Sequence, residues 1–362
     1  MDRINISSFI KNRAQAFGFD LAGMTRPFVS EHAEYLRHSA KLGSYRDMKW
    51  FSDTVEKRID MVSSFRWARS VIMLGTAYRI LPERPRNRDG VTIGSYARIT
   101  DYHKVLFSNA ERFLSALESA LGKGIKSKIY VDTGPLLEKE TAMNAGLGFI
   151  GKNTLLIHPE LGSSLFLAEI LTDIEIPFEN PRLDHSCGDC TSCIRACPSG
   201  ALQPYRLDPS RCISWLTIEY KGIIPDELKP KIGHRAFGCD ICQQVCPYNN
   251  NTCESLAGSA FFKSLNLPEN IMDLLFMNEE QFTRMFRDYP IFRAGHDSFI
   301  RNLLICLGNS GESPGKAEVE RFLENESIPV RDAASYALKA LGVRNGADEA
   351  RTRDLRRDRP AF

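Results

Sequence analysis

Eight of the ten cysteines in this chain fall between residues 187 and 246, and their spacing repeats. The first group reads Cys187-Gly-Asp-Cys190-Thr-Ser-Cys193-Ile-Arg-Ala-Cys197-Pro198. The second group reads Cys239-Asp-Ile-Cys242-Gln-Gln-Val-Cys246-Pro247, and Cys212 lies between the two. Thiolates at such short intervals can grip one metal centre, and the proline that ends each group turns the chain away from it. We expect the metal itself to organise this segment.

The first group has the C-x2-C-x2-C-x3-C-P spacing of bacterial ferredoxins, in which the fourth cysteine binds a second [4Fe–4S] cluster. The second group is one thiolate short of a full set, and Cys212 can supply it. The most economical assignment gives one cluster Cys187, Cys190, Cys193 and Cys246. It gives the other cluster Cys197, Cys212, Cys239 and Cys242. The sequence therefore predicts two [4Fe–4S] clusters and electron transfer.

Structural zinc and disulfide bonds are the alternatives for these cysteines. Zinc also binds C-x2-C pairs, but it needs only four thiolates per site and has no use for the longer spacing. Disulfides are rare in reducing compartments. The N-terminus has neither an apolar signal core nor a twin arginine, so we expect a cytoplasmic protein with reduced thiols. The remaining Cys253 and Cys306 are expected to be small buried hydrophobes.

The composition indicates a globular protein of more than one domain. Its 362 residues can bury two or three cores, and 43% hydrophobic with 25% charged residues are ordinary values. No apolar run is long enough to span a bilayer, so we expect no membrane partner. The net charge of +2 predicts no global attraction to nucleic acid, and any basic surface must be local.

The pattern favours a multidomain α+β protein that begins with an α/β domain over residues 1–180. Mostly apolar runs predict strands over 70–78, 128–131, 154–157 and 164–171. Apolar residues at helical spacing predict helices near the N-terminus, over 101–121 and over 136–145. Strands that alternate with helices indicate an α/β layer.

Three segments follow. Residues 181–255 are expected to form a bacterial-ferredoxin-like domain with the two clusters. Residues 256–343 are expected to form a HEAT-like helical repeat, with Pro329 at the start of the last helix and Gly342 at its end. This repeat is either a docking surface for a large partner or a plain bundle that supports the cluster domain. Residues 344–362, with six arginines and four acids, are expected to be a disordered basic tail.

One glycine run and one acid stand out from the rest. Gly146-Leu-Gly148-Phe-Ile-Gly151 matches G-x-G-x-x-G, but a predicted helix precedes it and a strand follows, the reverse of a dinucleotide site. The run is then a helix C-cap with a turn, or backbone laid against a flat cofactor. Asp132 ends a predicted strand, where ligands gather in α/β sheets. Its carboxyl is a proton donor if burial raises its pKa, or else part of an Asx turn.

Longer motifs together resemble the epoxyqueuosine reductase family. They are Ser95-Tyr-Ala-Arg-Ile-Thr-Asp-Tyr-His103, Asp132-Thr-Gly-Pro-Leu-Leu-Glu138, Ala145-Gly-Leu-Gly-Phe-Ile-Gly-Lys-Asn153, Cys212-Ile-Ser-Trp-Leu-Thr-Ile-Glu-Tyr-Lys-Gly222, Phe237-Gly-Cys-Asp-Ile-Cys-Gln243 and Arg301-Asn-Leu-Leu-Ile-Cys-Leu-Gly-Asn309. The match runs from near the N-terminus to about residue 342, and the tail is not part of it.

The resemblance implies that epoxyqueuosine at the wobble position of a tRNA is reduced to queuosine, the last step of queuosine biosynthesis. The reaction would be a two-electron epoxide deoxygenation via low-valent, base-off cobalamin fed by the two clusters. The partners would be a tRNA with a GUN-type anticodon and an external electron donor, flavodoxin or ferredoxin, and we expect a monomer. The proton donor of the family falls on Asp132.

The resemblance also assigns contacts. The expected corrin contacts are Arg58, Ala97, Tyr102, Asp132, Asn153, His158, Ser214 and Asp240. Lys221, Arg293 and Arg301 are expected to contact tRNA phosphates. Without the resemblance, two interpretations of Tyr102, His103 and His158 stay open: they are either ligand contacts or ordinary polar surface residues. Arg58 belongs to a charged string that would normally be solvated. Some relatives carry a cysteine near the position that is Ala97 in this chain. Because alanine has no thiol, we do not expect an axial thiolate from this loop.

Two other functions compete. A reductive dehalogenase-like corrinoid reductase would share cobalamin and two clusters, but such enzymes normally carry a twin-arginine export signal. An electron-transfer subunit would share the clusters alone, but it would not need an N-terminal domain of this size or a helical repeat.

Overall fold

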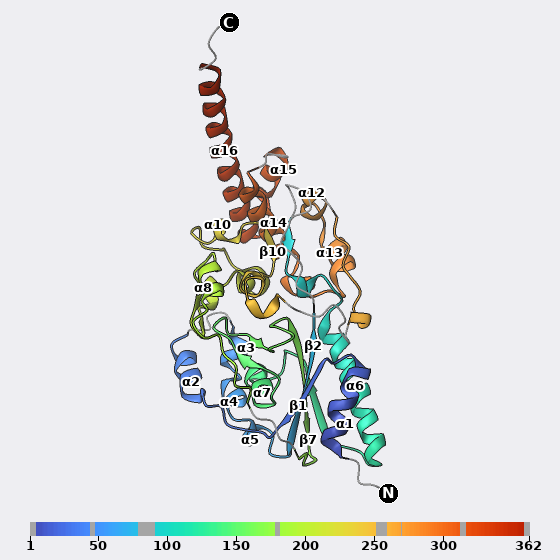
Figure 1. Ribbon diagram of the computed structural model, residues 1–362. Helices are drawn as coiled ribbons and strands as arrows, with labels where there is room; N and C mark the ends of the chain where they lie inside the picture. Colours follow the sequence, from blue (N-terminus) through green and yellow to red (C-terminus); the bar gives the residue numbers. More distant parts are fainter. Residues whose placement is uncertain are drawn as a thin grey trace. The chain divides into compact units, whose positions relative to one another are not determined.

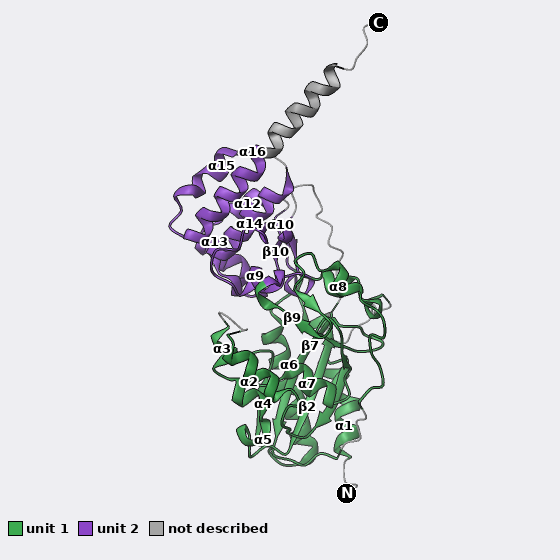
Figure 2. Ribbon diagram, turned by 90° about the vertical axis from the view of Figure 1, so that its left-hand side faces the viewer, with its two compact units in different colours: residues 1–81, 99–210, 240–264 green, residues 82–98, 211–239, 265–362 purple. Residues whose placement is uncertain are grey.

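The computed structural model describes residues 5–43, 48–78, 91–177, 182–250, 259–268, 270–311 and 316–357, and it leaves side chains beyond residue 342 undescribed. The chain divides into two compact units, which Figure 2 colours separately. Unit 1 comprises residues 1–81, 99–210 and 240–264, and unit 2 comprises residues 82–98, 211–239 and 265–362. This division cuts through the range 181–255, which we expected to be a separate cluster domain.

Unit 1 is built on a four-stranded sheet with the strand order β1-β2-β7-β4 (Figure 1). The strands are β1 (Leu21–Thr25), β2 (Ser70–Ala77), β4 (Ser127–Tyr130) and β7 (Leu165–Thr172). β2 is buried along its whole length, as its apolar run predicts. Every pairing is antiparallel, so the α/β layer that we expected is wrong and the unit is α+β. Alternation of helices and strands along a chain does not by itself fix the strand directions.

Helices cover both faces of this sheet. Figure 1 shows α1 (Ile6–Arg13) and α6 (Tyr102–Leu121) on one side and α7 (Glu138–Asn144) on the other. The apolar row of α6 is buried, and α7 shares a core cluster with Val71 and Met73 of β2. The helices predicted near the N-terminus, over 101–121 and over 136–145 are therefore confirmed.

The other elements of unit 1 are short. They are α2 (Ala33–Lys41), α3 (Lys49–Ser52), α4 (Val55–Ile59), α5 (Met61–Ser64), α8 (Ser192–Ala196), α11 (Ile241–Gln244), β5 (Phe149–Ile150), β6 (Leu156–Ile157), β8 (Leu202–Gln203) and β9 (Arg206–Leu207). Across the chain, 3-10 helices lie at Ala14–Phe17, Ser95–Ala97, Pro209–Arg211, Pro247–Asn249, Ser259–Phe261, Pro290–Ala294 and Arg321–Glu324.

Unit 2 is mainly helical. Its two longest helices, α14 (His296–Ser310) and α16 (Ile328–Arg357), pack closely because Gly308 has no side chain. A Cβ on Gly308 would lie 2.8 Å from the Cα of Ala337. The other elements are α9 (Ile213–Ile218), α10 (Lys229–Ile232), α12 (Ile271–Leu275), α13 (Glu279–Phe286), α15 (Lys316–Glu320) and the parallel pair β3 (Thr92–Ile93) and β10 (Arg235–Phe237). The HEAT-like arrangement of these helices stays a prediction.

α16 does not end where we expected. Gly342 was expected to stop the helix, and residues 344–362 were expected to be disordered, but the backbone is helical to Arg357. A glycine inside a helix costs only about 1 kcal/mol relative to alanine, so it does not end the hydrogen-bond ladder. Residues 358–362 lie outside the described residues. No helix in the described part of the chain is long and apolar enough to cross a membrane.

Arg301 joins α14 to the rest of unit 2. It is only 1% exposed, and its guanidinium donates to the carbonyl oxygens of Leu216, Tyr220 and Gly222 at 2.7–2.9 Å. Burial lowers the pKa of Arg301 to about 10. The expected contact of Arg301 with a tRNA phosphate is therefore corrected: its donors are committed to buried backbone, which leaves them no reach to a phosphate.

Replacement of Arg301 by methionine is expected to destabilise unit 2 strongly. Three buried carbonyl oxygens would lose a charged donor, at a cost of roughly 2–5 kcal/mol in the free energy of unfolding. Arg293→Met is the matched control, since the Arg293 side chain is 43% exposed and its loss should cost under about 1 kcal/mol. Urea unfolding followed by circular dichroism measures both, and equal losses would contradict the structural role of Arg301.

Candidate metal centre and active site

Four cysteines of unit 1 line one hollow, and they are Cys187, Cys190, Cys193 and Cys246. Ile157 and Pro247 add apolar walls. These are the same four cysteines that the spacing assigns to one cluster. Among the described residues, no three His, Cys, Asp or Glu side chains are grouped so that they could hold a single metal ion. A four-iron cube instead binds one thiolate at each iron, so its ligands are spread around a larger core.

The chemistry of this hollow fits a [4Fe–4S] cluster. Burial raises the pKa of Cys246, and the neighbouring thiols Cys187, Cys193 and Cys190 raise it further. Burial and then Cys187 raise the pKa of Cys193 in the same way. Four thiolates this close repel one another unless an iron core balances their charge. The backbone N–H of Lys152 also donates to Sγ of Cys187 at 3.3 Å, which stabilises the thiolate.

The glycine run brings Lys152 to this hollow. Gly146 ends α7 in the left-handed region with a φ of 77°, and its N–H returns to the carbonyl of Met143. A Cβ on Gly148 would lie 2.5 Å from the carbonyl oxygen of Ile157, so this glycine lets β5 pair closely with β6. The run is therefore a helix C-cap followed by a hairpin, and its Gly148 packs against the backbone of β6.

Lys152, at the tip of this hairpin, also contacts the cysteine loop through its side chain. Its Nζ donates to the carbonyl oxygens of Gly188 at 2.6 Å and Cys190 at 3.1 Å. Lys152 was not predicted from the sequence as a functional residue, although its place directly after the glycine run is a signal that marks it. The contacts place a positive charge beside the predicted cluster.

The other four cysteines are divided between the units. Cys197 and Cys242 lie in unit 1, and Cys212 and Cys239 lie in unit 2. Their role as the second ligand set stays a prediction from the spacing. Cys306 is buried, as expected, and Cys253 lies outside the described residues.

Asp132 follows the edge strand β4 and has a φ of 57°, a left-handed conformation that residues other than glycine rarely adopt. Because the sheet is antiparallel, the carboxyl-edge rule does not explain this position. Two contacts hold the loop instead. The N–H of Asp132 donates to Oε1 of Glu138 at 3.1 Å, and Nη1 of Arg58 donates to the carbonyl of Leu136 at 2.9 Å. Arg58 is thus buried rather than part of a solvated face.

The carboxyl of Asp132 meets the first turn of α6. Its Oδ2 accepts from the hydroxyl of Tyr102 and lies 3.2 Å from Nε2 of His103. The other ring nitrogen of His103, Nδ1, lies 2.7 Å from Oδ1 of Asp101. That same oxygen accepts the backbone N–H of His103 and so caps α6. The Tyr102 ring stacks between His103 and Phe166, at centroid distances of 4.1 and 4.3 Å, which fixes the hydroxyl.

The pKa values of several titratable groups in this site are raised by burial or by their neighbours. Burial lowers the pKa of His103, but the hydrogen bonds to Asp101 and Asp132 outweigh it and raise the pKa to about 9. Burial, followed by the charge of Asp132, raises the pKa of Glu138 to about 8. Burial also raises the pKa of Glu169, the one acid in β7, well above its usual value. Near neutral pH the site therefore carries an imidazolium beside Asp132 and a largely neutral Glu138. Sequence reasoning missed Glu169, although a lone acid in an apolar strand marks it.

The remaining predicted corrin contacts come from both units. In unit 1, Asn153 lines the cysteine hollow, and Nδ1 of His158 accepts backbone N–H groups from its own turn. Asp240 is buried just before α11. In unit 2, Ala97 is buried and Ser214 lies in α9. Contact of these residues with a corrin stays a prediction.

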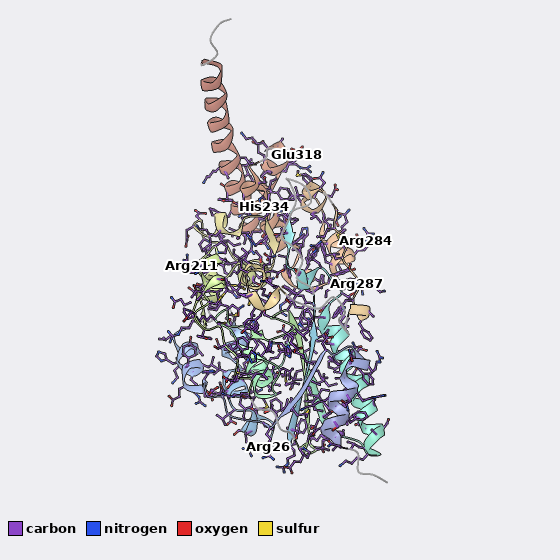
Figure 3. All side chains as sticks on the ribbon, viewed as in Figure 1. Arg26, Arg211, His234, Arg284, Arg287 and Glu318 are labelled. Carbon is purple, nitrogen blue, oxygen red and sulfur yellow. The ribbon has the colours of Figure 1, made fainter. Side chains whose placement is uncertain are left out.

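Unit 2 carries exposed cations on its surface. Arg293 is partly exposed and pairs with Glu219, whereas Nζ of Lys221 donates to three backbone carbonyls, one of them that of Arg293. Arg284 in α13 and Arg287 just after it are exposed and were missed in the sequence (Figure 3). Of the two phosphate contacts still predicted, Arg293 therefore has the more available side chain.

Two family models match this chain. Residues 186–249 match the 4Fe-4S double cluster binding domain, and residues 58–133 match the domain described as Epoxyqueuosine reductase QueG, DUF1730. The first range holds all eight cysteines of the predicted clusters, and the second ends directly after Asp132. The fold and the cysteine hollow thus define an iron–sulfur oxidoreductase.

Comparisons over the whole chain are more specific. The epoxyqueuosine reductase of Pseudomonas aeruginosa is 34% identical over 354 residues, which cover 94% of this chain and 96% of the relative. That of Cyclobacterium marinum is 34% identical over 299 residues, which cover 82% and 95%. The chain belongs to the epoxyqueuosine reductase family.

Solved structures of this family have the same fold. A crystal structure of epoxyqueuosine reductase with an epoxyqueuosine-modified tRNA-Tyr stem loop matches with a TM-score of 0.79 at 29% identity, over 92% of this chain and 89% of that one. The Bacillus subtilis enzyme, with its catalytic aspartate loop swung out of the active site, matches with a TM-score of 0.79 at 28% identity, over 92% and 89%.

Replacement of Lys152 by methionine is expected to make the adjacent cluster harder to reduce. The change removes a positive charge next to the cysteine loop, so the midpoint potential should move to more negative values. Lys152→Arg keeps the charge and should shift the potential less, and Lys123→Met, at an exposed lysine beyond α6, is the control. Redox titration of the reconstituted protein by EPR measures all three. An unchanged potential in Lys152→Met would contradict the assigned role.

Proposed function

We propose that this protein reduces epoxyqueuosine in tRNA to queuosine, the last step of queuosine biosynthesis. Membership of the epoxyqueuosine reductase family over nearly the whole chain supports the activity. The single structural observation that carries it is the hollow of four cysteines in the same unit as the hydrogen-bonded Asp132. Such a unit can both receive electrons and deliver a proton, which is what removal of an epoxide oxygen needs.

The proposed cofactors are two [4Fe–4S] clusters and one base-off cobalamin. Cobalamin, when bound, supplies a low-valent cobalt centre that can reduce a carbon–oxygen bond. The residues present fit it in one respect. The Tyr102 ring stacks on Phe166 and gives a flat apolar surface, and the Tyr102 hydroxyl donates a hydrogen bond to the Asp132 carboxyl beside that surface. Arg58, Asn153, His158 and Asp240 of unit 1, with Ala97 and Ser214 of unit 2, are the other proposed contacts. An external one-electron donor, flavodoxin or ferredoxin, would refill the clusters.

The role of Asp132 in this reaction is to give a proton to the epoxide oxygen. Its side chain is 51% exposed, so the carboxyl is accessible to a bound nucleotide. The hydroxyl of Tyr102 and the ring of His103 contact its Oδ2 and hold the carboxyl in place. The protein alone buries the Asp132 carboxyl only partly, so the bound base of the substrate would complete the exclusion of water from this carboxyl.

Recognition of the tRNA is proposed to involve the anticodon loop of a GUN-type tRNA. RNA loops present splayed bases, which enzymes that act on a base can take into a pocket. In unit 2, Arg293 is the proposed phosphate contact, with Lys221 beside it and Arg284 and Arg287 on the same unit. The predicted HEAT-like helices would serve as this docking surface.

The direct test uses the reconstituted protein, a chemical reductant and tRNA that carries epoxyqueuosine. Nucleoside mass spectrometry after digestion should show queuosine formed at the expense of epoxyqueuosine, with dependence on added cobalamin. The same preparation should contain about eight irons per chain. Queuosine formation that does not depend on cobalamin would overturn the cofactor assignment, and no formation at all would overturn the function.

Asp132→Asn is expected to reduce single-turnover queuosine formation by roughly 100-fold or more, since an amide accepts hydrogen bonds but cannot give up a proton as a carboxylic acid does. Iron content and tRNA affinity should stay as in the wild type. Asp53→Asn, at an exposed acid of the same unit, is the control and should retain activity. Full activity of Asp132→Asn would show that Asp132 only shapes its loop.

Arg293→Glu is expected to weaken tRNA binding by about tenfold and to lower the slope of log K against log salt by about 1, because one phosphate contact is lost. Arg26→Glu is the matched control, since Arg26 is an exposed, ion-paired arginine of unit 1 (Figure 3). Filter binding or anisotropy at several salt concentrations measures both. Equal effects of the two variants would argue against a local contact at Arg293.

A further inference from the structure

Removal of an epoxide oxygen needs two protons, and one carboxyl holds only one. Two carbon–oxygen bonds break, a carbon–carbon double bond forms, two electrons arrive from the external donor through the clusters, and the oxygen leaves as water. Opening of the first bond places one proton on the oxygen, and departure of water takes the second. If Asp132 gives both protons, it must be recharged between the two steps. This inference rests on the function proposed above.

We propose that His103, held by Asp101, is the proton reservoir that recharges Asp132 during the reduction. Asp101, His103 and Asp132 form a continuous chain of contacts, with 2.7 Å between Oδ1 of Asp101 and Nδ1 of His103 and 3.2 Å between Nε2 of His103 and Oδ2 of Asp132. One proton hop along the second contact reloads the carboxyl. His103 is a positioning and supplying residue, because it acts on the substrate only through Asp132.

The geometry itself fixes the protonation of the reservoir. Asp132 becomes a carboxylate once it has given its first proton, and Asp101 is a carboxylate throughout. Carboxylates only accept hydrogen bonds, so the ring between them then carries a proton on both nitrogens. Delivery of two protons therefore requires Asp132 and His103 both to be protonated when the first bond opens. The raised pKa of His103, about 9, agrees with this charge. A cation that loses Nε2–H becomes a neutral imidazole, which Asp101 still holds through Nδ1–H. The ring can therefore give up one proton without leaving its place.

The groups around His103 all belong to the same small site. Asp101, Tyr102 and Lys104 come from the start of α6, Asp132 follows β4, and Glu138 opens α7. Asp101 and Asp132 raise the pKa of His103, and their hydrogen bonds outweigh desolvation. Glu138, with its pKa raised to about 8, is largely neutral near pH 7 and adds little charge there. Tyr102 is the competing donor, because its hydroxyl also contacts Oδ2 of Asp132.

The substitution Asp101→Asn tests the reservoir role of His103 while it preserves the fold of α6. Asparagine is as good an N-cap as aspartate, so α6 keeps its first turn. The amide carries no charge, so the pKa of His103 should fall. Deuterium exchange at the histidine C2 position, read by mass spectrometry of the His103 peptide from about pH 5 to about pH 10, measures this pKa in the substrate-free protein. His158 gives the internal control and should exchange alike in both proteins.

The pH profile of single-turnover queuosine formation is the second measurement. In the wild type the rate should fall as pH rises through about 9, the pKa of His103. In Asp101→Asn this alkaline fall should move to lower pH, and in His103→Gln it should disappear while the rate drops by about tenfold or more at neutral pH. Tyr102→Phe should keep the wild-type alkaline limb.

The outcomes separate this inference from the function on which it rests. A wild-type protein that forms no queuosine at any pH overturns the function. A wild-type protein that turns over, together with an Asp101→Asn variant whose exchange pKa falls but whose profile does not move, overturns the reservoir alone. A profile that moves in Tyr102→Phe and not in Asp101→Asn assigns the reservoir to Tyr102 instead.

Discussion

The repulsion among four crowded thiolates is the constraint on which the cluster-binding part of this protein depends. Cys187, Cys190, Cys193 and Cys246 share one hollow, where burial and the neighbouring thiols oppose the ionisation of Cys193 and Cys246. An iron core resolves this conflict, since it both deprotonates and neutralises the thiols. The segment has few apolar residues of its own, so its stability and its cofactor are linked, and loss of iron should loosen the loop around α8.

The surrounding fold supports this centre from outside the cysteine motif. The β5–β6 hairpin offers the cysteine loop one backbone N–H and one ammonium from Lys152. Gly148, which opens this hairpin, allows β5 to approach the backbone of β6 closely. On the sheet of the same unit, buried Arg58 holds the loop after Asp132 through a carbonyl. Both functional regions thus rely on side chains that contact the backbone of a neighbouring loop.

How far the sequence could predict this protein depends on the range of the interactions. Cysteine spacing, the apolar run of β2 and the periodicity of α6 are local signals, and each predicted its element. Strand direction is set by which strands pair, and that information is absent from alternation along the chain. Arg58 and Arg301 look solvated in a charged or mixed string, yet both are buried because distant carbonyls accept their donors. Gly342 does not end its helix, because one glycine costs a helix only about 1 kcal/mol and the backbone of α16 continues through it.

The central claim is that electrons held by the clusters remove the epoxide oxygen. Protein that has been reduced and then freed of excess reductant and of any external donor tests this directly. It is mixed with epoxyqueuosine tRNA, and samples are divided between EPR of the reduced clusters and nucleoside mass spectrometry. The account predicts that two electrons leave the clusters for each queuosine formed, with matching time courses. Queuosine that forms while the clusters stay reduced, or clusters that become oxidised without queuosine, would contradict it.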